Sequence, residues 1–234
     1  MDRILRIPLI PVLAVQALMV RSRAQMLPEP EGPRRGRTGS GPALRLLVAG
    51  DSSAAGVGVS VQAEALSGAL VSRLSQHAEV DWRLEATTGH RTRDTLDRLA
   101  ALPDLHFDVA VVALGVNDTT RFMPPKAFAR RQAELAQILI NRFGVRLVLL
   151  NAIPPIAQFP LLPNPLAWTL GRHAERLEAA RQAELAQMNE AEILAPEVPF
   201  DPKYIAEDGF HPNALAYSVW AEQLDRRIRL FLQT

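Results

Sequence analysis

The residues of this chain that can do chemistry lie in short, turn-like segments. Ser52 lies in Gly50-Asp-Ser-Ser53, directly after an apolar run. A serine hydroxyl becomes a nucleophile when a nearby base takes its proton. Asp208 and His211 are three residues apart in a segment rich in turn residues. In this spacing His211 is a candidate general base, and Asp208 is a candidate carboxylate that orients the imidazole ring.

Two further segments supply candidate hydrogen-bond donors. Asn117 follows the most strand-like run of the chain, and its side-chain amide can donate to a developing oxyanion. Gly89 follows another apolar run, and its backbone N–H can donate to the same oxygen. Each residue taken alone is also ordinary turn chemistry. The prediction of a catalytic site therefore depends on finding these segments together.

The elements that must position these residues alternate between apolar runs and helix-forming segments. We predict strands at 44–49, 80–86, 108–114, 145–150 and 198–200, and helices at 61–77, 93–101, 125–142, 168–193 and 214–231. Continuous apolar strands separated by helices indicate a parallel sheet covered on both faces. We predict an α/β fold, a flavodoxin-like three-layer α/β/α sandwich with a parallel sheet of about five strands. In such a sheet the carboxyl ends of the strands share one edge, where sites form.

The order of the segments resembles that of the SGNH hydrolase superfamily, also called GDSL esterases and lipases. The resemblance covers roughly residues 44–232, and the ending 208–213 looks like that of the bacterial multifunctional thioesterase/lysophospholipase group. The resemblance implies a catalytic triad of Ser52, Asp208 and His211, and an oxyanion hole of the Ser52 N–H, the Gly89 N–H and the Asn117 side chain. Ser53 stands where the older family name expects Leu, which we interpret as a packing difference.

We therefore expect a serine esterase that hydrolyses small carboxylic esters, with short acyl chains favoured, through an acyl-enzyme. The mechanism requires no metal and no cofactor. A thioesterase or lysophospholipase, a carbohydrate O-deacetylase and an acyltransferase share the same machinery and stay open. A non-catalytic, membrane-tethered binding protein is the alternative from another class. The chain has no cysteine, which excludes thiolate catalysis and Cys-ligated zinc.

A long apolar loop, residues 152–168, follows the strand predicted at 145–150. Long loops without secondary structure of their own are often functional. We predict that Ile156, Phe159, Leu161 and Leu162 line or cover an acyl pocket; the alternative is a loop that packs on the sheet edge.

The chain is predicted to comprise a leader at 1–27, a linker at 28–43 and the hydrolase domain at 44–234. Residues 7–20 are apolar except for Gln16, and arginines stand on both sides. They are interpreted as a membrane anchor or export signal, as a helix packed on the domain, or as a helix weakly bound at a membrane. A cytoplasmic location is favoured over a membrane-anchored or periplasmic one. Residues 1–40 carry a net charge of +4 and the remainder −3, which argues against nucleic-acid binding by the domain.

Overall fold

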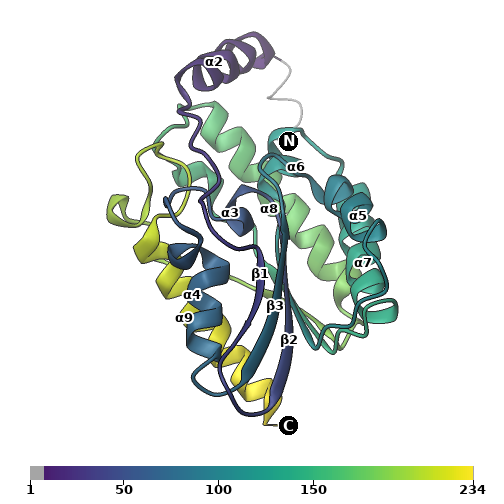
Figure 1. Cartoon of the computed structure of the whole chain (residues 1–234). Helices are drawn as coiled ribbons and strands as arrows, with labels where there is room; N and C mark the ends of the chain where they lie inside the picture. Colours follow the sequence, from purple (N-terminus) through teal and green to yellow (C-terminus); the bar gives the residue numbers. More distant parts are fainter. Residues whose placement is uncertain (1–7, 234) are drawn as a thin grey trace.

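The structure, a computed structural model, describes residues 8–233. One sheet of six strands runs through the centre in the order β1-β3-β2-β4-β5-β6 (Figure 1). The strands are β1 (Arg35–Thr38), β2 (Ala43–Gly50), β3 (Glu79–Ala86), β4 (Val109–Ala113), β5 (Leu147–Asn151) and β6 (Ala191–Leu194). The five strands β2 to β6 are parallel, and β1 adds an antiparallel edge. The predicted flavodoxin-like α/β fold with about five parallel strands is confirmed.

Helices cover both faces of the sheet. They are α2 (Ile10–Arg23), α3 (Ser52–Ala55), α4 (Leu66–Leu74), α5 (Thr92–Ala100), α6 (Val116–Thr120), α7 (Pro125–Asn141), α8 (Leu166–Leu185) and α9 (Ala214–Leu232), with 3₁₀ turns η1 (Gln62–Glu64), η2 (Ile156–Gln158) and η3 (Pro202–Tyr204). Apolar side chains of α4 and α9 pack on one face of the sheet. Those of α5, α7 and the end of α8 pack on the other. This burial on both faces explains why the parallel strands are apolar throughout.

Two segments differ from the sequence-based expectation. The helix predicted over 168–193 ends at Leu185, and residues 191–194 form strand β6 on the sheet edge. Alanine, glutamate and leucine favour helix locally, but pairing with β5 overrides that preference. Residues 198–200, predicted as the last strand, belong to a loop instead.

The segment 28–43, predicted to be a linker without regular structure, contains strand β1. Arg35–Thr38 pairs with β3 across four positions. All four β1 residues are exposed, and two of them are arginines, as is typical of a charged edge strand. The hydrophobic pattern gave no sign of it because an exposed edge strand needs no apolar face.

The apolar stretch of the leader forms helix α2, which packs on the loop before α8; residues 1–7 lie outside the described residues. The single polar residue of that stretch attaches it: Gln16 donates to the Asn164 carbonyl at 2.6 Å and accepts from the Leu166 N–H at 3.0 Å. Across residues 8–233, no helix combines the length and the apolar character needed to cross a membrane.

Candidate active site

The Ser52 turn forms because β2 ends tightly against β4. Gly50 has φ +151°, and a Cβ there would lie 2.1 Å from the Ala113 carbonyl oxygen, so only glycine fits. The Asp51 N–H donates to the same carbonyl at 3.1 Å. Asp51 then caps the short helix α3, its carboxylate accepting from the Ser53 N–H, and Ser52 is the first residue of that helix.

His211 lies between Ser52 and Asp208. Its Nε2 is 2.8 Å from Ser52 Oγ, and its Nδ1 is 2.5 Å from Asp208 Oδ2. The loop that holds this pair is itself fixed by Asp208, whose Oδ1 accepts from the Phe210 and His211 N–H groups at 2.9 and 3.0 Å. The structure thus brings together the three residues that were predicted from the sequence to form a triad. Ser52 and His211 are 159 positions apart in the chain.

The electrostatics of the two aspartates differ. Burial alone would raise the pKa of Asp208, but hydrogen bonds from the His211 side chain and from the His211 and Phe210 N–H groups outweigh it, and the pKa lies below its ordinary value. Burial raises the pKa of Asp51 to about 6, opposed by hydrogen bonds from Ser53. Asp208 is therefore the carboxylate held as an anion beside the imidazole.

Ser53 also lies in the site, but in a different hydrogen-bonding position. Its Oγ donates to Asp51 Oδ1 at 2.8 Å, whereas Ser52 Oγ is the hydroxyl within reach of the imidazole. A side chain one residue further along a helix start points about 100° around the axis. The two hydroxyls are therefore distinguished by their partners, and Ser52 is the one next to a base.

Asn117 and Gly89 lie on neighbouring segments after β4 and β3. Asn117 is in α6, and its Nδ2 donates to the His90 carbonyl at 3.0 Å, which links α6 to the Gly89 loop. Gly89 has φ +82°, in the left-handed region, and a Cβ there would meet nothing within 4 Å. Asn117 is part of the pocket wall described below, and Gly89 lies outside that wall.

Glu29 holds the Gly89 loop from the outside and was missed in the sequence. Its Oε1 accepts from the Thr88 N–H at 2.7 Å and from Thr88 Oγ1 at 2.9 Å. Its Oε2 accepts from Arg34 at 2.8 Å, and Arg34 also donates to the Ala86 carbonyl. Burial would raise the pKa of Glu29, yet the hydrogen bonds from Thr88 and the Arg34 charge lower it. The only sequence signal was a carboxylate in a segment taken as linker.

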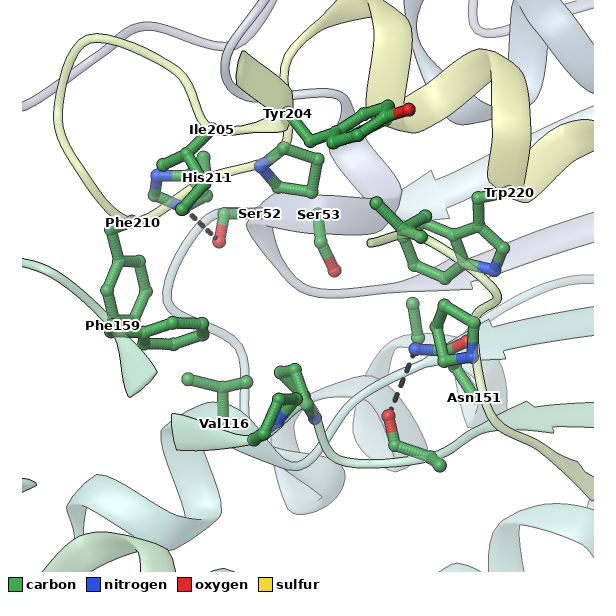
Figure 2. A pocket seen from close by; sticks show the side chains of 18 of the residues that line it. Ser52, Ser53, Val116, Asn151, Phe159, Tyr204, Ile205, Phe210, His211 and Trp220 are labelled. Carbon is green, nitrogen blue, oxygen red and sulfur yellow. Dashed lines mark hydrogen bonds between the residues drawn. The ribbon is translucent and has the colours of Figure 1, made fainter. Parts of the chain in front are cut away.

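A pocket of about 150 Å³ opens beside Ser52 and His211 (Figure 2). Its wall is mostly apolar and combines the active edge of the sheet, the loop after β5, the 196–205 loop and α9. Phe159 stacks on Phe200 at 5.5 Å between centroids and meets Phe210 edge-on at 4.7 Å. Other lining residues include Val116, Val198, Tyr204, Ile205 and Trp220. Such a wall suits an apolar group attached to a carbonyl at Ser52.

The side of the pocket away from His211 carries two polar side chains, Asn151 and Trp220 (Figure 2). Within the described residues, the buried Asn151 Oδ1 and Trp220 Nε1 have no hydrogen-bond partner. Buried polar atoms are normally satisfied, so an ordered water is expected to fill this role.

The four residues predicted to line or cover an acyl pocket lie in different places. Phe159 lines the pocket, whereas Ile156, Leu161 and Leu162 do not. The 3₁₀ turn η2 places Ile156 in an apolar cluster with Phe159 and α8, and Leu162 packs on that same cluster. The loop therefore contributes Ala152, Pro154, Pro155 and Phe159 to the wall, and the 196–205 loop and Trp220 add further apolar residues.

In the described part of the chain, no three His, Asp or Glu side chains gather in a way that could hold a metal ion. The chemistry available at this site is that of a serine, a histidine and a carboxylate beside an apolar pocket. This arrangement at the carboxyl edge of a three-layer α/β sandwich is the one that hydrolases with a serine nucleophile use.

Comparison with known proteins identifies the family. Residues 48–219 match the model of the GDSL-like lipase/acylhydrolase family, so the chain belongs to that family and is a carboxylic ester hydrolase. The resemblance to SGNH and GDSL hydrolases stated from the sequence is confirmed. A search of curated proteins gave no match.

Solved structures, two of them named as esterases, share the fold. The psychrotrophic esterase EstA from Pseudoalteromonas sp., in a structure inhibited by monoethylphosphonate, is 18% identical, with 81% of this chain and 99% of that chain covered and a TM-score of 0.62. TesA is 26% identical, with 77% and 95% covered and a TM-score of 0.60. Est24, a carbohydrate acetylesterase from Sinorhizobium meliloti, is 19% identical, with 80% and 99% covered and a TM-score of 0.54.

Proposed function

We propose that this hydrolase is a serine esterase that cleaves carboxylic esters of short acyl chains through an acyl-enzyme on Ser52. The observation that carries the proposal is the position of His211, 2.8 Å from Ser52 Oγ on one side and 2.5 Å from Asp208 on the other. Family membership supplies the reaction class, and this geometry supports the assignment of roles within it.

The proposed reaction has two halves. His211 Nε2 takes the Ser52 proton while Oγ attacks the ester carbonyl carbon, and the Asp208 carboxylate stabilises the resulting imidazolium. The tetrahedral intermediate collapses as His211 gives that proton to the leaving alcohol, which leaves the acyl group on Ser52. His211 then removes a proton from water, water attacks the acyl carbonyl, and Ser52 regains its proton as the carboxylic acid departs.

The negative charge on the carbonyl oxygen requires donors. We assign the Ser52 N–H, the Gly89 N–H and the Asn117 amide to this oxyanion hole. Asn117 lines the pocket beside Ser52, and its hydrogen bond to the His90 carbonyl holds α6 and the Gly89 loop at a fixed separation. Donors held in place before the reaction cost no reorganisation when the charge develops.

The size of the pocket supports short acyl chains. The pocket holds about 150 Å³, and an apolar cavity of that volume takes a molecule of roughly benzene size. That corresponds to an acyl chain of about six carbons, far smaller than a long lipid chain. We expect hydrolysis of a p-nitrophenyl ester series to peak at or below about C6 and to fall steeply beyond it. Turnover that rises steadily to C12 would contradict the proposed substrate class.

A carbohydrate O-deacetylase is the second candidate. Est24 is a carbohydrate acetylesterase with the same fold, and the pocket wall includes Asn151 and Trp220, two side chains with polar groups. Its test is acetate release from acetylated sugars, compared with p-nitrophenyl butyrate. Higher kcat/KM on the sugar esters would favour the deacetylase over the short-chain esterase.

A further inference from the structure

Helix α2 exposes a continuous group of apolar side chains to solvent. Ile10, Val15 and Leu18 are each more than half exposed, and Val12 and Met19 are more than a third exposed. None of the fourteen residues of α2 is buried. A helix that is apolar on all sides is normally covered on all sides, and a contiguous exposed apolar patch marks an interaction surface.

The domain already occupies the opposite side of α2. Leu13 and Val20 pack against the apolar cluster that contains Phe159, and Gln16 hydrogen-bonds the start of α8 in both directions. Rotating the exposed residues inward would break both contacts. The outer face, defined here as Ile10, Val12, Val15, Leu18 and Met19, therefore needs a partner from outside this domain.

The charges around α2 favour an anionic partner. From residue 3 to residue 28 the sequence holds four arginines and no acidic residue. Two of them, Arg21 and Arg23, are exposed in the last turn of α2. A second copy of the chain would bring two such basic segments together, and like charges oppose that contact. Acidic lipid headgroups above an apolar layer match both the charge and the apolar face.

We propose that α2 is a membrane-surface helix that binds anionic bilayers with its outer face toward the acyl chains. Fourteen helical residues extend about 21 Å, short of the roughly 30 Å of a bilayer core, so the helix lies along the interface. The arginines at its end meet the headgroups, and Gln16 and Leu13 stay attached to the domain.

This placement turns the active edge of the enzyme toward the membrane. In Figure 1, α2 lies beyond the end of the molecule where α3 and α6 follow the strands. The cluster that Leu13 and Val20 join includes Phe159 and Phe210, which line the pocket. A bound enzyme would receive esters that partition into the bilayer surface. The binding itself does not depend on the proposed esterase mechanism.

The test is co-sedimentation of the full chain with phosphatidylglycerol vesicles and with phosphatidylcholine vesicles. Leu18→Asp on α2 is compared with Leu230→Asp, a similarly exposed leucine near the end of α9. The C-terminus that follows α9 lies at the end of the molecule opposite α2 (Figure 1). Leu18→Asp is expected to weaken binding at least about tenfold, from the apolar area of one leucine, while Leu230→Asp leaves it unchanged. Arg21→Gln and Arg23→Gln are each expected to weaken binding to phosphatidylglycerol about fivefold.

Each result supports or overturns the proposal that α2 binds a membrane surface. Failure of the unmodified chain to bind phosphatidylglycerol vesicles, or equal losses in Leu18→Asp and Leu230→Asp, would overturn it. A dimer in analytical ultracentrifugation that Leu18→Asp converts to monomer would assign the face to a second copy and also overturn it. Turnover of a soluble ester monitors folding of each variant. Ser52→Ala should bind vesicles like the unmodified chain, so that a failure of the esterase mechanism is seen separately.

Discussion

Glu29→Gln is expected to slow catalysis although Glu29 lies outside the pocket. Glu29 accepts two hydrogen bonds from Thr88, next to Gly89, and one from Arg34. A bond to a charged acceptor is worth about 1 kcal/mol more than a neutral one, so the two Thr88 bonds lose roughly 2 kcal/mol together. The Glu29 side chain is 31% exposed, which reduces this to about 1–2 kcal/mol.

The lost hydrogen-bond energy weakens the positioning of the Gly89 N–H. We assign this N–H to the oxyanion of the transition state and not to the bound substrate. A loss of about 1–2 kcal/mol in the transition state corresponds to a fall in kcat of about 5- to 30-fold, with little change in KM. The assay is steady-state hydrolysis of p-nitrophenyl butyrate at neutral pH. Glu31→Gln is the matched control, since Glu31 is exposed in the same segment. Full kcat in Glu29→Gln, or an equal loss in Glu31→Gln, would refute the reasoning.

The remaining predictions concern the site itself. Asn117→Ala should lower kcat by about 10²–10³ as a lost oxyanion donor, measured on the same ester; a normal rate would remove Asn117 from that role. Phe159→Ala should shift the preferred acyl length upward by opening the pocket wall, read from the p-nitrophenyl series, with the melting temperature reporting on the fold. Because burial raises the pKa of Asp51 from 3.8 to about 6, the folded state holds that proton more tightly, and the stabilisation present below pH 3.8 is lost as the pH rises through 6. Asp51→Asn should therefore raise stability at pH 7 by up to about 3 kcal/mol, a gain that shrinks toward pH 4 in thermal unfolding.

The sequence allowed the parallel sheet to be predicted because burial on both faces leaves a continuous apolar signature. Strands β2 and β4 are almost wholly buried, and both were expected at nearly their observed bounds. Strand β6 is half-buried and follows a helix of the same composition, so local preference could not separate the two. Strand β1 is exposed along its length, and only its pairing partner β3 defines it.

The candidate catalytic residues were predictable because each occupies a turn whose chemistry is local. Ser52 follows a strand end, and Asp208 and His211 share one loop, so short motifs indicated them. The pocket wall was not predictable in the same way. Phe200 reaches Phe159 only through the path of the 196–205 loop, and Glu29 reaches Thr88 across 59 positions. Such contacts depend on tertiary packing that no spacing in the chain records.

Covalent labelling tests the role of Ser52 most directly. EstA was solved in a form inhibited by monoethylphosphonate. A p-nitrophenyl ethylphosphonate should therefore transfer its phosphonyl group to the nucleophilic serine Oγ of this chain, with release of p-nitrophenolate. Peptide mass spectrometry of the labelled chain locates the adduct, with Ser52→Ala and Ser53→Ala as paired variants. We predict one adduct, on Ser52, that is lost in Ser52→Ala and kept in Ser53→Ala. An adduct on Ser53, or inhibition that survives Ser52→Ala, would contradict the proposed nucleophile.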